Sequence, residues 1–272
     1  MGSFAIVAGV WLVGYALRTF ARPLLRKLGA LLYLLATWLA GYFLSGESWM
    51  GGAFAVAGWF LLPWVDIVLR VRSMRLPISK QLQYRPPPTQ DEFPALRETS
   101  VAFEDTGFER VEDTGWEGGE VRQFLRLFYL QEKRVQGAIS FNQQHGMGFG
   151  FISFTTRTKD GRVFITTDNP YSNLPQPPDI FVYSVRNAAS VTDLMEEHLS
   201  LLDTSGVDIA NNVDEIDPEH LPQLMSGELQ QQIRHNLRTG YIKDAGEGKF
   251  RYSWRGCFYL WGRVLRDMVR LA

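Results

Sequence analysis

"LGALLYLLATWLAGYFLSGESWMGGAFAVAGWFLLPWVDIVL", residues 28–69, decides the architecture of this chain. Residues 28–45 carry no charge, and residues 49–69 carry only Asp66. Each segment approaches the roughly 20 apolar residues that cross the hydrocarbon of a bilayer. The intervening "GES" leaves room only for a tight turn, so the stretch predicts a transmembrane helical hairpin. Two buried core helices of a soluble protein are the alternative, but such helices usually keep a polar stripe, which is missing here.

A shorter apolar run, "FAIVAGVWLVGYAL", occupies residues 4–17. A signal peptide begins with basic residues and ends at a small-residue cleavage site, and here no Lys or Arg precedes Arg18. We expect a further transmembrane helix that continues past Arg18, whose long side chain can reach the membrane surface. A re-entrant or interfacial helix is the alternative. The sequence therefore predicts two to three transmembrane helices.

Basic residues flank the apolar segments. The first group is Arg18, Arg22, Arg26 and Lys27, and the second is Arg70, Arg72, Arg75, Lys80 and Arg85. The "GES" turn carries only Glu47. Because positively charged loops stay in the cytoplasm, both groups are expected on the cytoplasmic side. With three spans, everything after residue 70 is cytoplasmic, as in an integral protein of a bacterial inner membrane.

Two residues of the second apolar segment stand out. Pro63 predicts a kink. Asp66 admits a functional interpretation, because ionisable residues inside membranes often serve function. Arg70 is its i+4 neighbour, and an ion pair on one helix face is the simpler interpretation.

The remainder of the chain reads as a soluble protein behind a proline-rich segment, "LPISKQLQYRPPPTQDEFP", residues 76–94. Its prolines predict an extended polyproline II spacer. We therefore divide the chain into a transmembrane region (1–70), a linker (71–94), an α+β domain (95–210) and a C-terminal helical, wing-like segment (211–272).

The α+β domain begins with a helix expected within 89–107, where Gly107 is well placed as the C-cap. From residue 121 the apolar period changes to two, which predicts strands at 121–130, 134–144, 148–158 and 162–168, and a fifth at 179–185. "KDGR" (159–162) predicts a type I′ hairpin turn. The fold expected is an antiparallel β-meander, followed by a helix at 190–202 that Ser190 and Asp193 cap.

The C-terminal segment predicts helices within 217–242, a turn and strand, and a last helix at 255–272. This helix–strand–helix order resembles the wing end of winged-helix domains over about 30 residues, without a complete helix-turn-helix before it. The last helix contains both apolar and arginine side chains. This composition suits a helix that packs against the core or one that lies on an anionic membrane surface. Cys257, the single cysteine, excludes an internal disulfide and reads as a buried, inert thiol.

The stretch "EDTGFERVEDTGW", residues 104–116, contains Asp-Thr-Gly twice, the active-site tripeptide of aspartic proteases. That site needs two carboxylates that share a proton, one from each of two lobes or subunits. Tripeptides eight residues apart cannot belong to two lobes of one chain, although a dimer could supply two copies of one tripeptide. We expect Asp105 in the last turn of a helix and Asp113 in a solvated loop, neither of them catalytic.

Few residues indicate chemistry. The net charge of −1 gives no global field for nucleic acid, which is not expected as a partner. The sequence has no phosphate-binding loop, no dinucleotide fingerprint and no histidines at metal spacing, so no cofactor or metal is expected. His145, on a turn, and Asp168, at a strand end, are the candidates for a catalytic site. His198 is expected to be a solvated or a capping histidine.

The function expected is that of a membrane-anchored protein with a cytoplasmic interaction or regulatory domain, including the case of an accessory subunit of a larger membrane complex. Its partners would be the lipid bilayer and another protein or a second copy of the chain. A membrane-bound hydrolase that uses His145 and Asp168 is one alternative. A membrane-tethered nucleic-acid regulator that uses the C-terminal segment is another.

Overall fold

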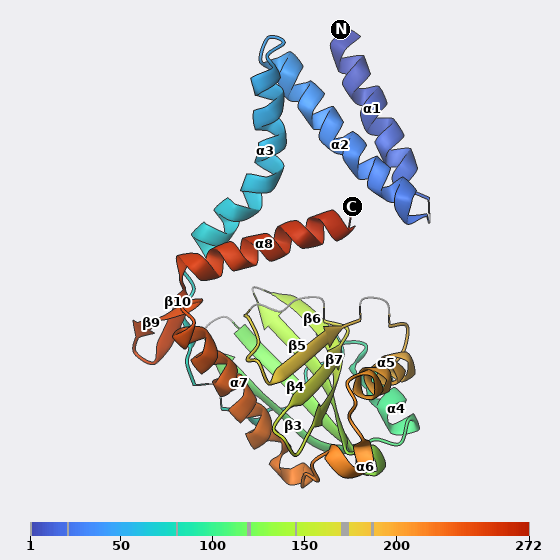
Figure 1. The fold of residues 1–272 in the computed structure, drawn as a ribbon, viewed down its shortest axis with the longest axis vertical. Helices are drawn as coiled ribbons and strands as arrows, with labels where there is room; N and C mark the ends of the chain where they lie inside the picture. The colour runs from blue at the N-terminus through green and yellow to red at the C-terminus, as the bar shows by residue number, and fades with distance from the viewer. Residues whose placement is uncertain are drawn as a thin grey trace. The chain divides into compact units, whose positions relative to one another are not determined.

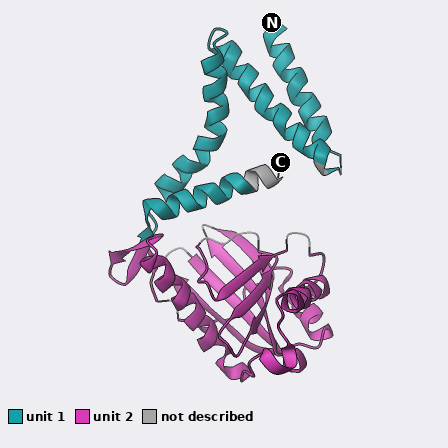
Figure 2. Ribbon diagram, viewed as in Figure 1, with its two compact units in different colours: residues 1–74, 251–272 teal, residues 75–250 magenta. Residues whose placement is uncertain are grey.

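A computed structural model describes residues 2–20, 22–79, 81–118, 121–144, 146–169, 174–185 and 188–271, except for the side chains of Pro23 and of residues 267–271. The chain forms two compact units (Figures 1 and 2). Unit 1 comprises residues 1–74 and 251–272, and unit 2 comprises residues 75–250.

Unit 1 is helical. Its elements are α1 (Gly2–Arg18), α2 (Pro23–Leu44), α3 (Trp49–Asp66), the π-helical turn η1 (Ile67–Val71) and α8 (Trp254–Leu271). Two helical segments, Leu24–Leu44 and Trp49–Val71, are long and apolar enough to cross a membrane. The expectation that the first helix continues past Arg18 is wrong: α1 ends there, and the Thr19 hydroxyl donates to the Ala16 carbonyl at 2.7 Å.

Small residues lie where the helices of unit 1 cross. A Cβ at Gly29 of α2 would come within 2.7 Å of the Gly14 carbonyl oxygen of α1, and a Cβ at Gly41 within 2.6 Å of the Gly51 carbonyl oxygen of α3. Large apolar side chains point outward instead, as Leu24 (75% exposed) and Phe54 (73% exposed) show. This distribution is typical of helices packed within a lipid bilayer, where close backbone approach replaces burial of large side chains.

The end of α3 matches the sequence-based interpretation. Pro63 lies inside the helix, and the π-helical turn follows it. The Arg70 guanidinium lies 2.7 Å from the Asp66 carboxylate, and both side chains are exposed. The i, i+4 ion pair is therefore confirmed.

Unit 2 has the α+β organisation expected from the sequence. Its helices are α4 (Leu96–Asp105), η2 (Gln131–Lys133), α5 (Val191–Thr204), α6 (Ile209–Asn212), η3 (Pro218–His220) and α7 (Leu221–Arg238). Its strands are β1 (Leu76–Pro77), β2 (Gln83–Tyr84), β3 (Glu109–Gly118), β4 (Val121–Leu130), β5 (Val135–Gln144), β6 (Met147–Arg157), β7 (Val163–Thr167), β8 (Ile180–Ser184), β9 (Ile242–Gly246) and β10 (Lys249–Tyr252), the last of which crosses into unit 1.

The main sheet has seven strands in the order β2-β3-β4-β5-β6-β7-β8. Neighbours from β2 to β7 are antiparallel, as expected for a meander. Two features differ from the expectation. Residues 109–118, expected to be a loop around Asp113, form β3. β8 pairs with β7 in parallel, with Ile180 opposite Val163.

Both faces of the sheet are covered (Figure 1). Phe124 and Phe128 of β4 belong to a core on one face, together with α4 and α5. Leu125 and Leu127, which alternate with them, belong to a core on the other face with Leu221 of α7. Strands buried on both faces read as continuous apolar runs, which explains the sequence of β4.

The proline-rich segment is part of the fold of unit 2. Leu76 and Pro77 pair with β10, which forms a second sheet in the order β1-β10-β9. Gln83 and Tyr84 pair with β3 at the edge of the main sheet. The segment is therefore bound to both sheets along part of its length.

Local chemistry accounts for the other boundaries. The first helix expected in this unit starts only at Leu96, after Pro94, which disfavours helical backbone in the residue before it. The Ser190 hydroxyl accepts the Asp193 N–H at 3.0 Å, so the predicted cap is confirmed. The "KDGR" turn is not type I′, because Gly161 has a positive φ (84°) and Asp160 does not.

Candidate functional site

The first Asp-Thr-Gly ends a helix. Asp105 is the last residue of α4, as predicted. The Thr106 hydroxyl donates to the Phe103 carbonyl at 2.8 Å, and Gly107 has a φ of 86°. Glycine takes this left-handed conformation without a steric penalty, which makes it a common residue after a helix C-cap. The tripeptide is a helix terminator.

The second Asp-Thr-Gly differs from the sequence-based expectation. Asp113 is not in a solvated loop; it lies on β3 and is 4% exposed. Arg126 of β4 donates from Nε and Nη2 to the two Asp113 carboxylate oxygens at 2.8 and 2.9 Å. Arg110 donates to the same carboxylate at 2.6 Å. A carboxylate held in this way by two guanidiniums is an acceptor in a buried ion pair, so its role is structural.

Thr114 and Gly115 connect β3 to the proline-rich segment. The Thr114 hydroxyl donates to the Gln83 carbonyl at 3.0 Å. The Arg85 N–H donates to the Asp113 carbonyl at 3.3 Å. A Cβ at Gly115 would overlap the Gln123 carbonyl oxygen of β4, so only glycine fits. Each residue of the tripeptide thus has a structural reason.

The hydrolase candidates are only partly described. The Asp168 carboxylate accepts the Ile152 N–H at 2.7 Å, and burial raises its pKa. His145 lies outside the described residues. The proposed His145–Asp168 pair therefore stays a prediction, and the visible role of Asp168 is to join the end of β7 to β6.

His198 is buried, so the expectation of a solvated histidine is wrong. Its Nε2 lies 2.9 Å from the Thr156 hydroxyl and its Nδ1 lies 2.9 Å from the Thr166 hydroxyl. Burial lowers the pKa of His198 to about 4. The neutral imidazole, with one donor and one acceptor nitrogen, fits between two hydroxyls that can each donate or accept. His198 links α5 to β6 and β7.

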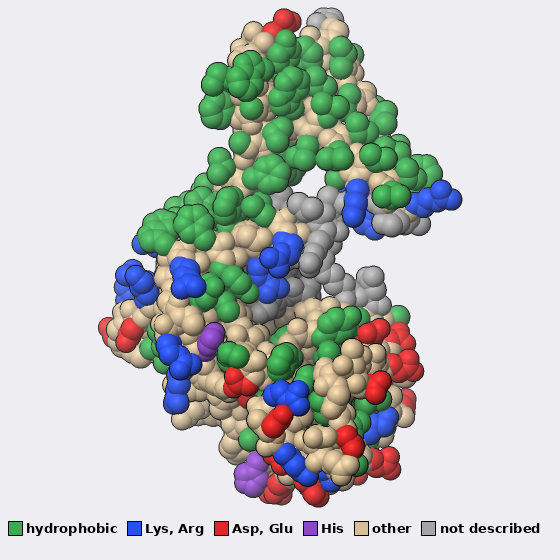
Figure 3. All heavy atoms as spheres, viewed as in Figure 1, with side chains coloured by type: hydrophobic (Ala, Val, Ile, Leu, Met, Phe, Trp, Pro, Cys, Tyr) green, Lys and Arg blue, Asp and Glu red, His purple; other side chains and the backbone are tan. Residues whose placement is uncertain are grey.

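The basic residues predicted to flank the membrane lie at helix ends. Arg18 ends α1, Arg22 precedes α2, and Arg26 and Lys27 lie in its first turns. Arg70, Arg72 and Arg75 lie in or after η1. On the face seen in Figure 3, hydrophobic side chains cover α1 to α3, with blue spheres gathered at the α1–α2 turn and red ones at the α2–α3 turn. The ends of the apolar helices therefore differ in charge.

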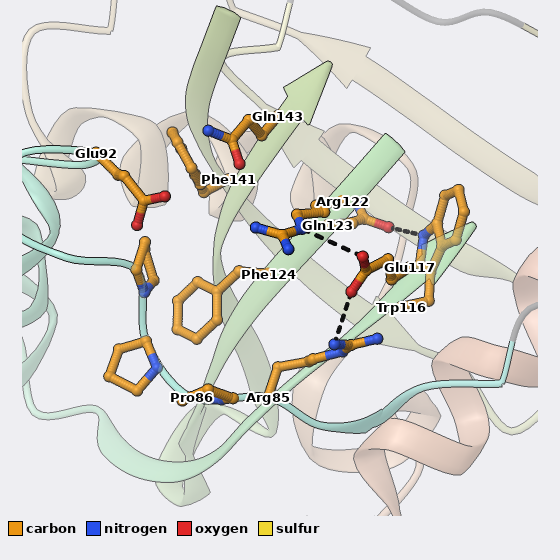
Figure 4. A pocket seen from close by; sticks show the side chains of 12 residues that line it. Arg85, Pro86, Glu92, Trp116, Glu117, Arg122, Gln123, Phe124, Phe141 and Gln143 are labelled. Carbon is orange, nitrogen blue, oxygen red and sulfur yellow. Dashed lines mark hydrogen bonds and ion pairs between the residues drawn. The ribbon is translucent and has the colours of Figure 1, made fainter. Parts of the chain in front are cut away.

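A cleft of about 240 Å³ lies on unit 2 (Figure 4). Its wall is the proline-rich segment Arg85–Pro88. β3, β4 and β5 supply the rest of the lining: Trp116, Glu117, Arg122, Gln123, Phe124, Phe141 and Gln143, with Glu92 from the turn before α4.

The floor of the cleft is aromatic and fixed. Phe124 and Phe141 pair across β4 and β5, and each is 6% exposed. The Phe93 ring stacks on Phe141 with centroids 4.9 Å apart. The Trp116 indole N–H donates to the Gln123 side-chain oxygen. The Phe124 ring faces the prolines in Figure 4. These rings are held rigidly by their neighbours, and Phe124 and Phe141 expose little of their surface.

The charges in the cleft are matched. The Glu117 carboxylate accepts hydrogen bonds from Arg122 at 3.3 Å and from Arg85 at 2.9 Å. The hydrogen bond from Arg122 is the main cause of the lowered pKa of Glu117. Glu92 accepts the Thr89 N–H at 2.9 Å, which lowers its pKa too. The Arg122 guanidinium points between the two carboxylates (Figure 4). Carboxylates with lowered pKa remain ionised at neutral pH and are poor general acids.

The lining of the cleft combines aromatic, proline, amide and charged side chains. Its lining contains no histidine, cysteine, serine or lysine. Among the residues that the structure describes, no group of His, Cys, Asp and Glu could hold a metal ion. Aromatic rings beside prolines, with arginines at the rim, suit an extended peptide segment.

Sequence reasoning did not find this cleft. The sequence predicts a spacer at Pro86–Pro88, and it predicts β4 and β5 only as two strands of a meander. The lining combines residues from 85 to 143, and the pairing of β2 with β3 that joins them is a long-range contact. The available signal was one aromatic residue in the first half of β4, Phe124, and one in the second half of β5, Phe141.

Comparison with protein-family models, with curated proteins and with solved structures finds no match for this chain.

Proposed function

We propose that this chain is a membrane-anchored protein whose unit 2 lies in the cytoplasm and binds a segment of a partner protein in the cleft. The partner is another subunit of a membrane complex or a second copy of the chain. The observation that carries the proposal is the cleft itself, which joins aromatic and proline surfaces to ionised, mutually paired charges.

Support for the membrane anchor comes from the packing of unit 1. Only 11% of the residues in each candidate span are buried, whereas a core helix of a soluble protein is mostly buried. Glycines lie at the helix crossings, and the Trp59 indole N–H donates to the Thr37 hydroxyl at 3.0 Å between α3 and α2. Such polar contacts join helices within bilayers.

Support for the cytoplasmic orientation comes from charge. Basic residues occur at the α1–α2 turn and after α3, and the α2–α3 turn carries Glu47. In the topology with α1 as a third span, these two basic regions share one side of the membrane, and unit 2 follows on that side. α1 has 17 residues, about 26 Å at 1.5 Å per residue, which is slightly short of a 30 Å hydrocarbon layer.

Support for partner binding comes from the fixed geometry of the cleft. Phe124, Phe141 and Phe93 are held by the core, so little side-chain freedom is lost when a ligand covers them. Arg122 remains accessible, since its side chain is 65% exposed. Aromatic and arginine side chains are enriched at protein interfaces for these reasons.

Site-specific photo-crosslinking in native membranes tests the proposal. A photoreactive phenylalanine analogue replaces Arg122 at the cleft or, as the matched control, Glu132, which is exposed just beyond the other end of β4. We expect a discrete adduct from position 122 and none from position 132, with the partner identified by mass spectrometry. The absence of an adduct at position 122, or the same adducts at both positions, contradicts partner binding in the cleft.

A further inference from the structure

The last helix, α8, has two chemically distinct faces. At about 100° per residue, four large apolar side chains fall on one side: Trp254, Phe258, Trp261 and Leu265. Three arginines fall on the other side: Arg255, Arg263 and Arg266. Trp254 and Phe258 are 48% and 54% exposed despite their size. A helix with an aromatic face and an arginine face is the type that lies in a membrane surface.

The first half of α8 packs on the end of α3. The Trp64 ring stacks on Phe258 with centroids 4.4 Å apart, and it lies 5.7 Å from the ring of Trp261. The Trp261 indole N–H donates to the Phe60 carbonyl at 2.8 Å. Phe60 lies one turn before Pro63, where the helix ladder is interrupted.

These contacts fix the depth of α8 along α3. The exposed Asp66–Arg70 pair marks where the helix leaves the hydrocarbon, because a charge inside it is strongly disfavoured. The Arg72 guanidinium lies 4.0 Å from the centre of the Trp254 ring. α8 is therefore attached between the last apolar turn of α3 and its basic end, the depth at which tryptophan and arginine gather in membrane proteins.

We propose that α8 lies in the plane of the cytoplasmic membrane surface, with its aromatic face in the acyl boundary and its arginines against anionic lipid headgroups. The proposal rests on the membrane anchor proposed above and adds a specific lipid-binding element. Lipid is the occupant that fits, because the apolar face continues the apolar surface of α3 and the opposite face is basic.

Depth-dependent quenching in the full chain tests the proposal. The chain is reconstituted in liposomes of phosphatidylcholine alone or mixed with phosphatidylglycerol, each containing lipids brominated near the headgroup or near the chain end. An environment-sensitive fluorophore is attached at Val264→Cys, on α8 and 38% exposed. Phe54→Cys, 73% exposed on α3, reports the span, and Glu132→Cys reports the aqueous domain. The unmutated chain, whose Cys257 is buried, measures background labelling.

We expect the Phe54 label to be quenched most by deep bromine and the Val264 label by shallow bromine. Quenching at Val264 should be stronger with phosphatidylglycerol, and neither bromine should quench the Glu132 label. Arg263→Gln and Arg266→Gln should each lower the ratio of lipid-contacting to water-exposed label at Val264 about fivefold. Arg97→Gln, an exposed arginine on α4, serves as the control and should leave the ratio unchanged.

The outcomes separate the two proposals. An unquenched Phe54 label overturns the membrane anchor and, with it, the placement of α8. A quenched Phe54 label beside an unquenched Val264 label overturns only the placement of α8. Blue-shifted emission from that Val264 label would then show that this part of α8 contacts protein. Red-shifted emission would show that it contacts water. Equal quenching of Val264 in both lipid mixtures overturns the role of the arginines.

Discussion

Replacement of Asp113 by alanine should destabilise unit 2 strongly. The Arg126 side chain is 10% exposed and the Asp113 side chain 3%, and two hydrogen bonds join them. Removal of one partner from a buried pair leaves an uncompensated charge, which costs about 3–5 kcal/mol. The Arg126 Nη1 still donates to the Ser100 hydroxyl at 3.0 Å, which places the expected loss near the lower end, about 3 kcal/mol.

Asp105→Ala is the matched control, because it alters the same residue of the other Asp-Thr-Gly. Asp105 is exposed in the last turn of α4, where the helix dipole disfavours a carboxylate. Its replacement should change the free energy of unfolding by no more than about 0.5 kcal/mol. Addition of Arg126→Met to Asp113→Ala should recover part of the loss, because no buried charge then remains without its partner.

The assay is urea unfolding of the full chain in detergent, followed by hydrogen–deuterium exchange of peptides from β4 to β6. These peptides report unit 2 alone, whereas most tryptophans lie in unit 1. Thermal unfolding of the same peptides should occur roughly 6–12 °C lower in Asp113→Ala. A loss below about 1 kcal/mol, or equal losses for Asp113→Ala and Asp105→Ala, would refute the assignment of a buried ion pair.

Four further outcomes are expected. The folded-state pKa of His198, about 4, lies below the unfolded value of 6.5, so stability should fall by roughly 3 kcal/mol as pH drops from 6.5 to 4, and unfolding curves of His198→Gln should lack this dependence. Gly115→Ala should destabilise unit 2 by at least about 1 kcal/mol, whereas Gly227→Ala, inside α7 with open space at its Cβ, should be neutral or stabilising in the same assay. Residues 75–250 expressed alone should give a cooperative melt, and a fragment starting at residue 95 should unfold at a lower temperature, since it lacks β1 and β2. A reporter fused after Ala272 should be active only if it functions in the cytoplasm; activity of a periplasmic reporter there would reverse the topology.

Local patterns predicted the strands and helices whose apolar period is strong. β4 has apolar residues at seven of its ten positions, and its predicted ends are those observed. α5 has a serine cap with an acidic partner, and its ends were predicted within two residues. The prediction for residues 109–118 was wrong because their polar side chains suggested a loop. Asp113 is buried on β3 only because Arg126 neutralises it, and the pairing of two residues 13 positions apart leaves no periodic signal.

The cleft and the parallel pairing of β8 were missed for the same physical reason. Each depends on which segments meet in space, and neither is set by the preferences of its own residues. The same apolar alternation serves a parallel or an antiparallel neighbour, so the residues of β8 do not reveal the direction in which it pairs. The polyproline segment reads as a spacer because nothing in its sequence reveals that Gln83 and Tyr84 pair with β3.

Because β2 pairs with β3, force on the proline-rich segment that leads into unit 2 is transmitted to the main sheet. Tension on the chain from the N-terminal side first meets β1 in the smaller sheet and then reaches the main sheet at an edge strand of two residues, Gln83 and Tyr84. Such a strand separates from its neighbour one hydrogen bond at a time. Each freed residue lengthens the free part of the proline-rich segment by up to about 3.3 Å. Because Arg85–Pro88 form the wall of the cleft, peeling would remove that wall. Tension on the proline-rich segment and occupancy of the cleft are therefore mechanically linked.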